Sequence, residues 1–445
     1  NTADNNTAVG NEALISNTTG GSNIAIGAYA LDANTTGASN VAIGRNALTA
    51  NTTADDNTAV GYAALASNTT GTKNVAIGYG AIDSNTTGNS NTAVGYNALE
   101  TITTSSYNTA FGSRALENCA GDYNTAVGAQ ALDAVTTGTK NVGMGWHVLS
   151  ANTTGSNNVA LGGEALDANT TGGYNIAIGQ NSLSVSTTGN YNVAIGQDAL
   201  ANSTVSDNVA IGRAAMVANT TGTNNVALGA LALTTNTTGP NNTAIGYYAL
   251  KDNTTGNGNT ALGRTALQSN TTSNNNTGVG YQALQTNTGG GHVAVGANAL
   301  QAQTTGSENT ALGYEALKTA NGADADYNTA VGSEALKLST DGDRNVAVGW
   351  RALTNNTTGA KNVAIGIESL YTATTTDNNT AIGRRALYYS TTGTNLTAVG
   401  CNALYNNTTG ANNVACGMQA LENNTTGAKN TAVGKSALAT LSTGN

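Results

Sequence analysis

Apolar and polar residues alternate in a short block that recurs along the whole chain. The block reads Asn, then Thr, Val or Ile, then Ala, then Val, Ile or Leu, then Gly, as at 6–10, 23–27 and 430–434. When each unit is numbered from its closing glycine as position 0, there are 26 such glycines, most of them 17 residues apart, with three intervals of 16 and one of 19. A fixed period of this length is typical of a solenoid, in which each repeat packs only against its neighbours.

Each repeat predicts a short strand at positions −4 to −1, because β-branched residues occur at alternate places between Asn and Gly. After the glycine come two variable positions and an Ala-Leu pair at +3 and +4, which we interpret as leading into a second short strand. An NTTG turn at +7 to +10 then closes the repeat. The predicted fold is all-β, a parallel β-solenoid (β-roll) of about 26 coils of about 17 residues, oligomeric, with 1–445 forming one continuous repeat array.

Two assignments of the strand faces fit this pattern, because side chains alternate between the two faces of a strand. The one we favour directs position −1 and the Leu at +4 into the coil, and turns the Ala at −2 outward against another protomer. In the other, Ala lies inside a very thin coil and the Val/Ile stripe lies at an oligomer seam. In both, two or three apolar side chains per coil offset only part of the entropy cost of ordering it. We therefore expect stacked Asn ladders and self-association to contribute the rest.

Composition excludes several classes of function. The net charge is −9, the pI is about 4.6 and only 9% of residues are charged, whereas nucleic-acid-binding proteins carry clustered Lys and Arg. No run of 18 apolar residues occurs, so no membrane span is predicted. The three cysteines, in different columns of the repeat, form neither a disulfide framework nor a zinc motif.

The segments NIAIGAYA at 23–30 and NVAIGRNA at 40–47 resemble the head repeat of YadA-like trimeric autotransporter adhesins, and are also similar to repeats in phage and bacterial tail-fibre proteins. The resemblance covers the whole chain, although the NTTG segment makes each repeat longer than the familiar head repeat. It implies a β-roll, commonly left-handed and trimeric, that serves as an extracellular binding or spacer rod.

The expected function is therefore an extracellular structural fibre or adhesin rod at the cell surface, for attachment or as a spacer. Its expected partners are other copies of itself, in a homotrimer or an end-to-end filament, and host-surface glycans or matrix. The alternative is a phage tail-fibre shaft with receptor binding, carried on a virion. An ice-binding solenoid is a third hypothesis, weakened because the adjacent Thr residues at +8 and +9 should not both lie on one flat face.

Aromatic residues fall in variable columns and are expected to stack into surface rows. Such rows suit adhesion to glycans or other surfaces, and the alternative is that they only stabilise the coil stack or a seam between protomers. The candidate binding columns are Tyr62, Tyr79, Tyr96, Trp146, Tyr247, Tyr281, Tyr314, Trp350, Tyr371, Tyr388 and Tyr405.

The NTT triplet is also an N-glycosylation sequon. The competing interpretation is that Asn and Thr satisfy the backbone groups of the turn. The candidate glycosylation sites are Asn17, Asn34, Asn68, Asn85, Asn152 and Asn169.

The longest repeat interval carries NGADADYN at 321–328, and the following repeat carries STDGDRN at 339–345 in place of NTTG. Stacked loops would bring together Asp324, Asp326, Asp341 and Asp343, four hard oxygen donors suited to Ca²⁺, although a solvated acidic loop fits the same residues. Apart from this candidate calcium site no cofactor is expected. We also expect no enzyme activity, because no catalytic spacing of Ser, His, Asp or Glu occurs and the two histidines lie far apart.

Overall fold

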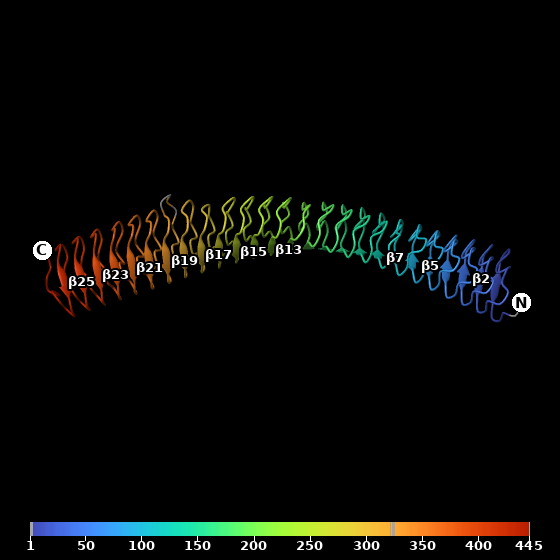
Figure 1. Cartoon of the computed structure of the whole chain (residues 1–445), viewed down its shortest axis with the longest axis horizontal. Helices are drawn as coiled ribbons and strands as arrows, with labels where there is room; N and C mark the ends of the chain where they lie inside the picture. The colour runs from blue at the N-terminus through green and yellow to red at the C-terminus, as the bar shows by residue number, and fades with distance from the viewer. Residues whose placement is uncertain (1–2, 321, 323–324, 445) are drawn as a thin grey trace. The chain divides into compact units, whose positions relative to one another are not determined.

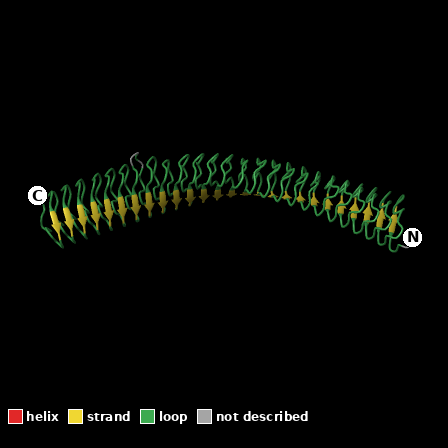
Figure 2. Cartoon of the chain, in the orientation of Figure 1, coloured by secondary structure: helices red, strands yellow, loops and turns green. Residues whose placement is uncertain are grey.

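The computed structural model describes residues 3–320, 322 and 325–444 of the chain. The chain divides into two units, Asn1–Thr223 and Asn224–Asn445, which we call the first and second unit. Both are parallel β-solenoids, built from one strand per coil joined by turns, and no helix occurs among the described residues (Figure 2). The predicted all-β, parallel β-solenoid fold is confirmed, whereas the predicted oligomeric state stays a prediction.

The first unit contains thirteen strands that follow one another along the chain (Figure 1). Neighbouring strands pair in parallel and in register, so that Ile24, Ala25 and Ile26 lie beside the corresponding residues of the next coil. The strands are β1 (Thr7–Val9), β2 (Ile24–Ile26), β3 (Val41–Ile43), β4 (Thr58–Val60), β5 (Val75–Ile77), β6 (Thr92–Val94), β7 (Thr109–Phe111), β8 (Thr125–Val127), β9 (Val142–Met144), β10 (Val159–Leu161), β11 (Ile176–Ile178), β12 (Val193–Ile195) and β13 (Val209–Ile211).

The second unit repeats this arrangement, and its strands pair in the same register. A rung spacing of about 4.8 Å gives thirteen coils a length on the order of 60 Å in each unit. The strands are β14 (Val226–Leu228), β15 (Thr243–Ile245), β16 (Thr260–Leu262), β17 (Thr277–Val279), β18 (Val293–Val295), β19 (Thr310–Leu312), β20 (Thr329–Val331), β21 (Val346–Val348), β22 (Val363–Ile365), β23 (Thr380–Ile382), β24 (Thr397–Val399), β25 (Val414–Cys416) and β26 (Thr431–Val433).

The predicted second strand is wrong, because the segment around Ala-Leu forms a turn instead. Residues at +2 and +4 are left-handed, as at Tyr29 (φ 61°) and Leu31 (φ 53°). Their N–H groups consequently point in opposite directions: Tyr29 donates to Asn11 of the previous coil and Leu31 to Ala47 of the next. A left-handed Leu costs about 1–2 kcal/mol, which full burial of its side chain, at about 1.5–3 kcal/mol, offsets.

The glycine at position 0 turns the chain out of the strand with a φ that other residues rarely adopt. Gly27, for example, has φ 135°, and a Cβ built on it would lie 2.5 Å from the carbonyl oxygen of Gly44 in the next coil. Both the backbone conformation and the close approach of the coils therefore require glycine here.

The interior of each coil is lined by the Ala at −2, the Ala at +3 and the Leu at +4, all fully buried in coils such as that of Ala42, Ala47 and Leu48. The favoured face assignment, with position −1 inside and the Ala at −2 outside, is therefore wrong. Position −1 faces outward, and Ile43 is 37% exposed. The alternative is correct in placing Ala inside a thin coil.

The thinness of the coil explains why Ala occupies the inner face of the strand. Gly143 replaces Ala at −2, and a Cβ added to it would lie 2.7 Å from Leu132 and 3.1 Å from Val148. Val148 stands where most coils have Ala at +3. A larger residue on one wall is thus matched by a smaller one on the other, as close packing requires.

Candidate functional site

Asparagines at position −4 form an interior column in each unit, which we call the −4 ladder. Within it Asn57 donates its backbone N–H to the side-chain oxygen of Asn40 in the previous coil, at 2.9 Å. Its side-chain nitrogen donates to the carbonyl oxygen of Gly71, at position +10 of the same repeat, also at 2.9 Å. Each asparagine of this ladder therefore accepts from one buried backbone N–H and donates to one buried backbone carbonyl of the stack.

Asparagines of the NTTG turns, at +7, form a second buried column, the +7 ladder. Asn68 donates to the side-chain oxygen of Asn51 in the previous coil, at 3.1 Å, and to Gly71 of its own turn, at 2.9 Å. The Gly71 carbonyl thus accepts from both ladders, since Asn57 also donates to it. The interpretation of these residues as partners of turn backbone groups is confirmed.

The candidate glycosylation residues all belong to the +7 ladder. Asn17 is 8% exposed, and the others are fully buried: Asn34, Asn68, Asn85, Asn152 and Asn169. An N-linked glycan would be bonded to the side-chain amide nitrogen that donates within the ladder and would replace one of its hydrogens. Glycosylation stays an untested prediction, and the folded coil gives these amide groups a structural role.

Threonines of the NTTG turn differ in what their hydroxyls do. At +8 the hydroxyl donates to the backbone of the next coil, as Thr35 does to the carbonyl oxygen of Thr52 at 3.0 Å. At +9 the side chain is exposed, as in Thr36. Adjacent threonines therefore do not form one flat hydroxyl face, and the ice-binding hypothesis gains no support from this edge.

Tyr62, Tyr79 and Tyr96 stack in consecutive coils of the first unit, as the sequence predicted. Their ring centroids are 5.0 and 5.5 Å apart and the ring planes differ by 13° and 16°. Stacked in this way, the rings cover one another's faces and present mainly edges and hydroxyls to solvent. The row is therefore well suited to stabilising the stack, at about 0.5–1.5 kcal/mol per pair, and poorly suited to binding a ligand face to face.

Tyr371, Tyr388 and Tyr405 form the second predicted row, with centroids 5.1 and 5.3 Å apart. Sequence reasoning missed Tyr389 beside this row, because its role depends on ring orientation. It also missed two stacked pairs at position −5, which have no longer run to reveal them: Tyr107–Tyr123 and Tyr174–Tyr191.

The remaining predicted aromatic residues share position +1 but occur in different parts of the column, each between 42% and 54% exposed. Arg351 lies over the Trp350 ring, at 4.7 Å from its centroid, and Arg264 lies 6.0 Å from the centroid of Tyr281. Such pairs contribute about 0.5–1 kcal/mol at exposed sites. The residues are Trp146, Tyr247, Tyr281, Tyr314 and Trp350.

The outer face of the strands, formed by positions −3 and −1, is the sheet face. In all 26 repeats these positions hold Thr, Val or Ile at −3 and an apolar residue at −1, and none is charged. Many of the larger side chains are substantially exposed, for example Ile77 at 40%, Phe111 at 43% and Leu312 at 47%. The charged residues of the chain lie in other columns.

The candidate calcium ligands lie only partly within the described residues, because Asp324 lies outside them. Asp326 accepts the backbone N–H of Ser307 at 2.5 Å, and Asp343 pairs with Arg344 at 2.5 Å. No group of three or more His, Cys, Asp or Glu able to hold a metal occurs within 3–320, 322 and 325–444. The calcium site, which also needs Asp341, stays a prediction.

Four acidic side chains occupy position +5 in consecutive coils of the first unit: Asp83, Glu100, Glu117 and Asp133. Burial raises the pKa of Asp83, Glu100 and Asp133, and the Glu117 and Asp83 carboxylates raise that of Glu100 further. Arg114 lies 3.8 Å from Glu117. The carboxylates of this row therefore repel one another, and Arg114 partly offsets that repulsion.

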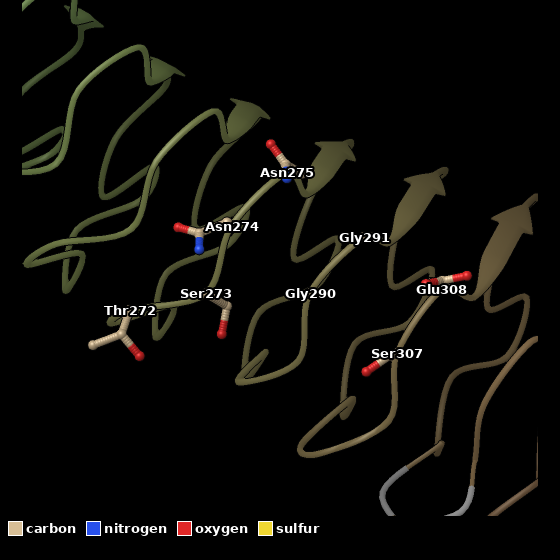
Figure 3. A pocket seen from close by; sticks show the side chains of 8 residues that line it. All are labelled: Thr272, Ser273, Asn274, Asn275, Gly290, Gly291, Ser307 and Glu308. Carbon is tan, nitrogen blue, oxygen red and sulfur yellow. The ribbon is translucent and has the colours of Figure 1, made fainter.

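A polar notch in the second unit lies where one coil has two consecutive glycines and therefore no side chains at these two positions. That coil is one of the three with 16 residues, and its turn has Gly290 and Gly291 where its neighbours carry longer residues. Figure 3 shows the two glycines between side chains of the flanking coils. The cavity measures about 520 Å³ and is lined by Thr272, Ser273, Asn274, Asn275, Gly290, Gly291, Ser307 and Glu308.

The notch is lined mainly by neutral hydrogen-bonding groups. Asn274 already accepts the backbone N–H of Asn257 at 2.8 Å, and Glu308 is the only ionisable residue of the lining.

In comparisons with known proteins, no protein-family model matches the chain and no curated protein matches it. Within the described residues the structure also has no helix that is long and apolar enough to cross a membrane.

Proposed function

We propose that the chain is a structural rod segment of an extracellular fibre or adhesin, which associates with further copies of itself through the sheet face. The observation that carries this proposal is the uncharged sheet face, which has an apolar residue at −1 and Thr, Val or Ile at −3 in every repeat of both units. On the surface of a soluble protein, charged residues normally interrupt such stripes. A large exposed patch that stays apolar marks an interaction site.

The sheet face is large enough to support an oligomer. Two columns of partly exposed side chains on thirteen strands present a surface on the order of 1,000 Å² in each unit. Soluble monomers seldom expose more than about 300–600 Å² in one patch, and a standard interface buries about 800 Å² per partner. A second copy offers a face of the same composition and rung spacing, so the apolar −1 columns of the two copies can pack against one another.

The interior of the coil supports a spacer role. Both ladders join each coil to its neighbours by hydrogen bonds between buried groups. A force applied along the stack is therefore distributed over many such bonds. Resemblance to YadA-like head repeats supports a homotrimer on a cell surface, with host-surface glycans or matrix as ligands. Resemblance to tail-fibre repeats supports the alternative, a phage fibre shaft carried on a virion.

The native mass of the chain tests self-association. At micromolar concentration the particle should have a multiple of 44.1 kDa. A double variant with Ile43→Lys and Ile77→Lys places two charges on the sheet face and should shift the particle towards the monomer. Thr36→Lys with Thr70→Lys adds the same charge on the exposed turn edge and should leave the mass unchanged. A wild-type particle of 44.1 kDa would remove the basis of the proposal.

The native cysteines supply a second readout without mutation. Cys416 lies exposed on the sheet face, Cys401 is half-buried at position +1, and Cys119 is buried. In the assembled particle a thiol reagent should label Cys401 faster than Cys416, and dissociation should reverse that order. Equal protection of both thiols in either state would place the interface elsewhere.

A further inference from the structure

Tyr389 is oriented differently from the stacked tyrosines beside it. Its ring meets those of Tyr388 and Tyr405 at 80° and 79°, with centroids 4.7 and 5.2 Å apart. Both faces of the Tyr388 ring are covered, by Tyr371 on one side and Tyr405 on the other. Since neither face of Tyr388 is free, its edge contacts one face of Tyr389, which leaves the opposite face to contribute to the 43% exposure of this side chain.

Several contacts hold this ring in place. Burial raises the pKa of the Tyr405 phenol, and a hydrogen bond with the Tyr389 side chain raises it further. The Tyr389 backbone N–H also donates to the Tyr405 carbonyl oxygen at 3.0 Å. On the same surface, Arg385 pairs with Glu368 at 2.7 Å. The flat face is thus preorganised, which lowers the entropy cost of binding a ligand.

Amide groups lie in the same column as the flat ring, at position +6 of the next two coils. Asn406 donates to the side-chain oxygen of Asn423 at 3.0 Å; the first is half-buried and the second exposed. On the other side, the hydroxyl of Thr372 is engaged with the Tyr388 carbonyl oxygen. The surface therefore combines one apolar ring face with neighbouring amides that can donate and accept hydrogen bonds.

This combination matches the chemistry of a pyranose ring, which has one face of C–H groups and a rim of hydroxyls. The electron-rich face of a tyrosine ring attracts the slightly positive C–H hydrogens, and amides bind the hydroxyls. We propose that Tyr389 is a stacking platform for a hexopyranose residue of a glycan, with Asn406 and Asn423 contacting its hydroxyls. The proposal rests on the adhesin role and names its ligand class and one contact site.

Saturation-transfer NMR with the whole chain tests the platform, with methyl β-D-glucopyranoside and methyl β-D-galactopyranoside as probes. We expect transfer to the ring C–H protons of at least one probe, reduced at least fivefold by Tyr389→Ala and retained by Tyr389→Phe. Tyr79→Ala removes a ring whose faces are both covered and should leave transfer unchanged. Absence of transfer from both probes, or equal transfer in Tyr389→Ala, would overturn the proposal.

Failure of this inference can be told apart from failure of the rod proposal. The platform lies at position +6, away from the sheet face, so pyranoside binding should persist when Ile43→Lys and Ile77→Lys dissociate the particle. An oligomer without pyranoside binding sinks only the platform. A monomer that binds pyranosides sinks only the self-association.

Discussion

The −4 and +7 ladders consist of the same buried side chain, yet the sequence departs from asparagine far more often in one than in the other. The −4 ladder is interrupted twice, by His292 and Leu396. The +7 ladder is interrupted by apolar and polar residues in several places, among them Ile102, Cys119, Val135, Ser186, Ser203, Ala373 and Ser390. Burial alone does not explain this difference, because both columns are interior.

Hydrogen-bond redundancy does explain it. Where Val135 replaces asparagine at +7, the carbonyl of Gly138 still accepts from Asn124 of the −4 ladder, at 2.9 Å. No backbone group loses its partner. An asparagine at −4, in contrast, supplies the acceptor for a backbone N–H of the next coil, which the +7 ladder does not reach. The first ladder is therefore required by the backbone, whereas the second is an addition to it.

The two exceptions in the −4 ladder follow the same rule. His292 accepts the Asn309 backbone N–H on Nδ1, at 3.1 Å, and its Nε2–H donates to Gly306 at 2.7 Å, so one ring reproduces both functions of the amide. Leu396 reproduces neither. The Gly410 carbonyl is still reached by Asn407 of the +7 ladder, so the cost falls on a single N–H of the next coil.

The largest effect should follow from breaking the −4 ladder inside a unit. Asn175→Leu removes the acceptor of the Asn192 N–H and the donor to the Gly189 carbonyl. Each buried unpaired group costs about 1–3 kcal/mol, so we expect a loss of about 4 kcal/mol in the local opening free energy. Hydrogen exchange measured on peptides that span the neighbouring coils reports this directly, because solenoids open locally.

Asn169→Val is the matched control in the +7 ladder. The Gly172 carbonyl keeps its donor from Asn158 at 2.8 Å, so the loss should be about 1 kcal/mol or less. Equal losses in the two variants would show that redundancy is not what separates the ladders.

Acidification should test the histidine that replaces asparagine. Burial lowers the pKa of His292 from its ordinary 6.5 to about 4, and protonation of Nδ1 would remove the acceptor for Asn309. Because the folded pKa lies below the unfolded one, stability is full above pH 6.5 and is lost as the pH falls towards 4. The loss should approach about 3 kcal/mol, measured by hydrogen exchange in the coils around His292.

His292→Asn restores the amide and should make the same coils insensitive to pH in this range. Acid sensitivity that survives the substitution would assign the titration to another group.

The sequence predicts the period, the position of the strand and the Asn ladders, because each depends on residue type at fixed spacing. It does not decide which face is inside, since Ala at −2 is compatible with close packing on either side. The paired change of Gly143 at −2 and Val148 at +3 indicates which face is inside. It can be interpreted in this way only once −2 is known to face +3. Left-handed Leu residues such as Leu31 resemble strand residues in sequence and were missed for that reason.

The candidate sites were also predictable only where they depend on residue type at a fixed spacing. Stacked rows such as Tyr62 and Tyr79 follow from in-register coils, so their alignment could be read from spacing. The flat orientation of Tyr389 depends on two perpendicular ring contacts, which no spacing encodes. The sequence did not decide whether Asn34 and its equivalents are buried, because an asparagine of a sequon and an asparagine of a ladder look identical in sequence.

Repairing the gap in the −4 ladder should stabilise the second unit. Leu396→Asn gives the Asn413 N–H a side-chain acceptor in the preceding coil, and Leu396 already donates its own N–H to Asn379 at 2.9 Å, so the register is in place. We expect a gain of about 1 kcal/mol, seen as slower hydrogen exchange in the flanking coils. Leu396→Ala leaves the acceptor missing and should destabilise. A gain from both variants would mean that steric relief, rather than a hydrogen bond, was responsible.

The smallest effect should come from two ion pairs on the rim, where a buried carboxylate meets two partly exposed lysines. They set a scale for the interior ladders. Glu315 lies 2.7 Å from Lys318 and 2.6 Å from Lys337. Hydrogen bonds with Lys318 and Lys337 lower its pKa from 4.5 to about 2. The folded pKa is again the lower one, so this stability is present above pH 4.5 and is lost as the pH falls towards 2.

Because both lysines are more than a quarter exposed, solvent screening should limit the contribution to about 1 kcal/mol or less. Glu315→Gln should therefore cost this amount at pH 7 and flatten the stability profile between pH 4.5 and 2, followed by hydrogen exchange in the coils around Glu315. The window lies below that of His292, so one acid titration separates the rim from the ladder. A larger loss for Glu315→Gln than for Asn175→Leu would mean that surface charge, and not the −4 ladder, holds the coils together.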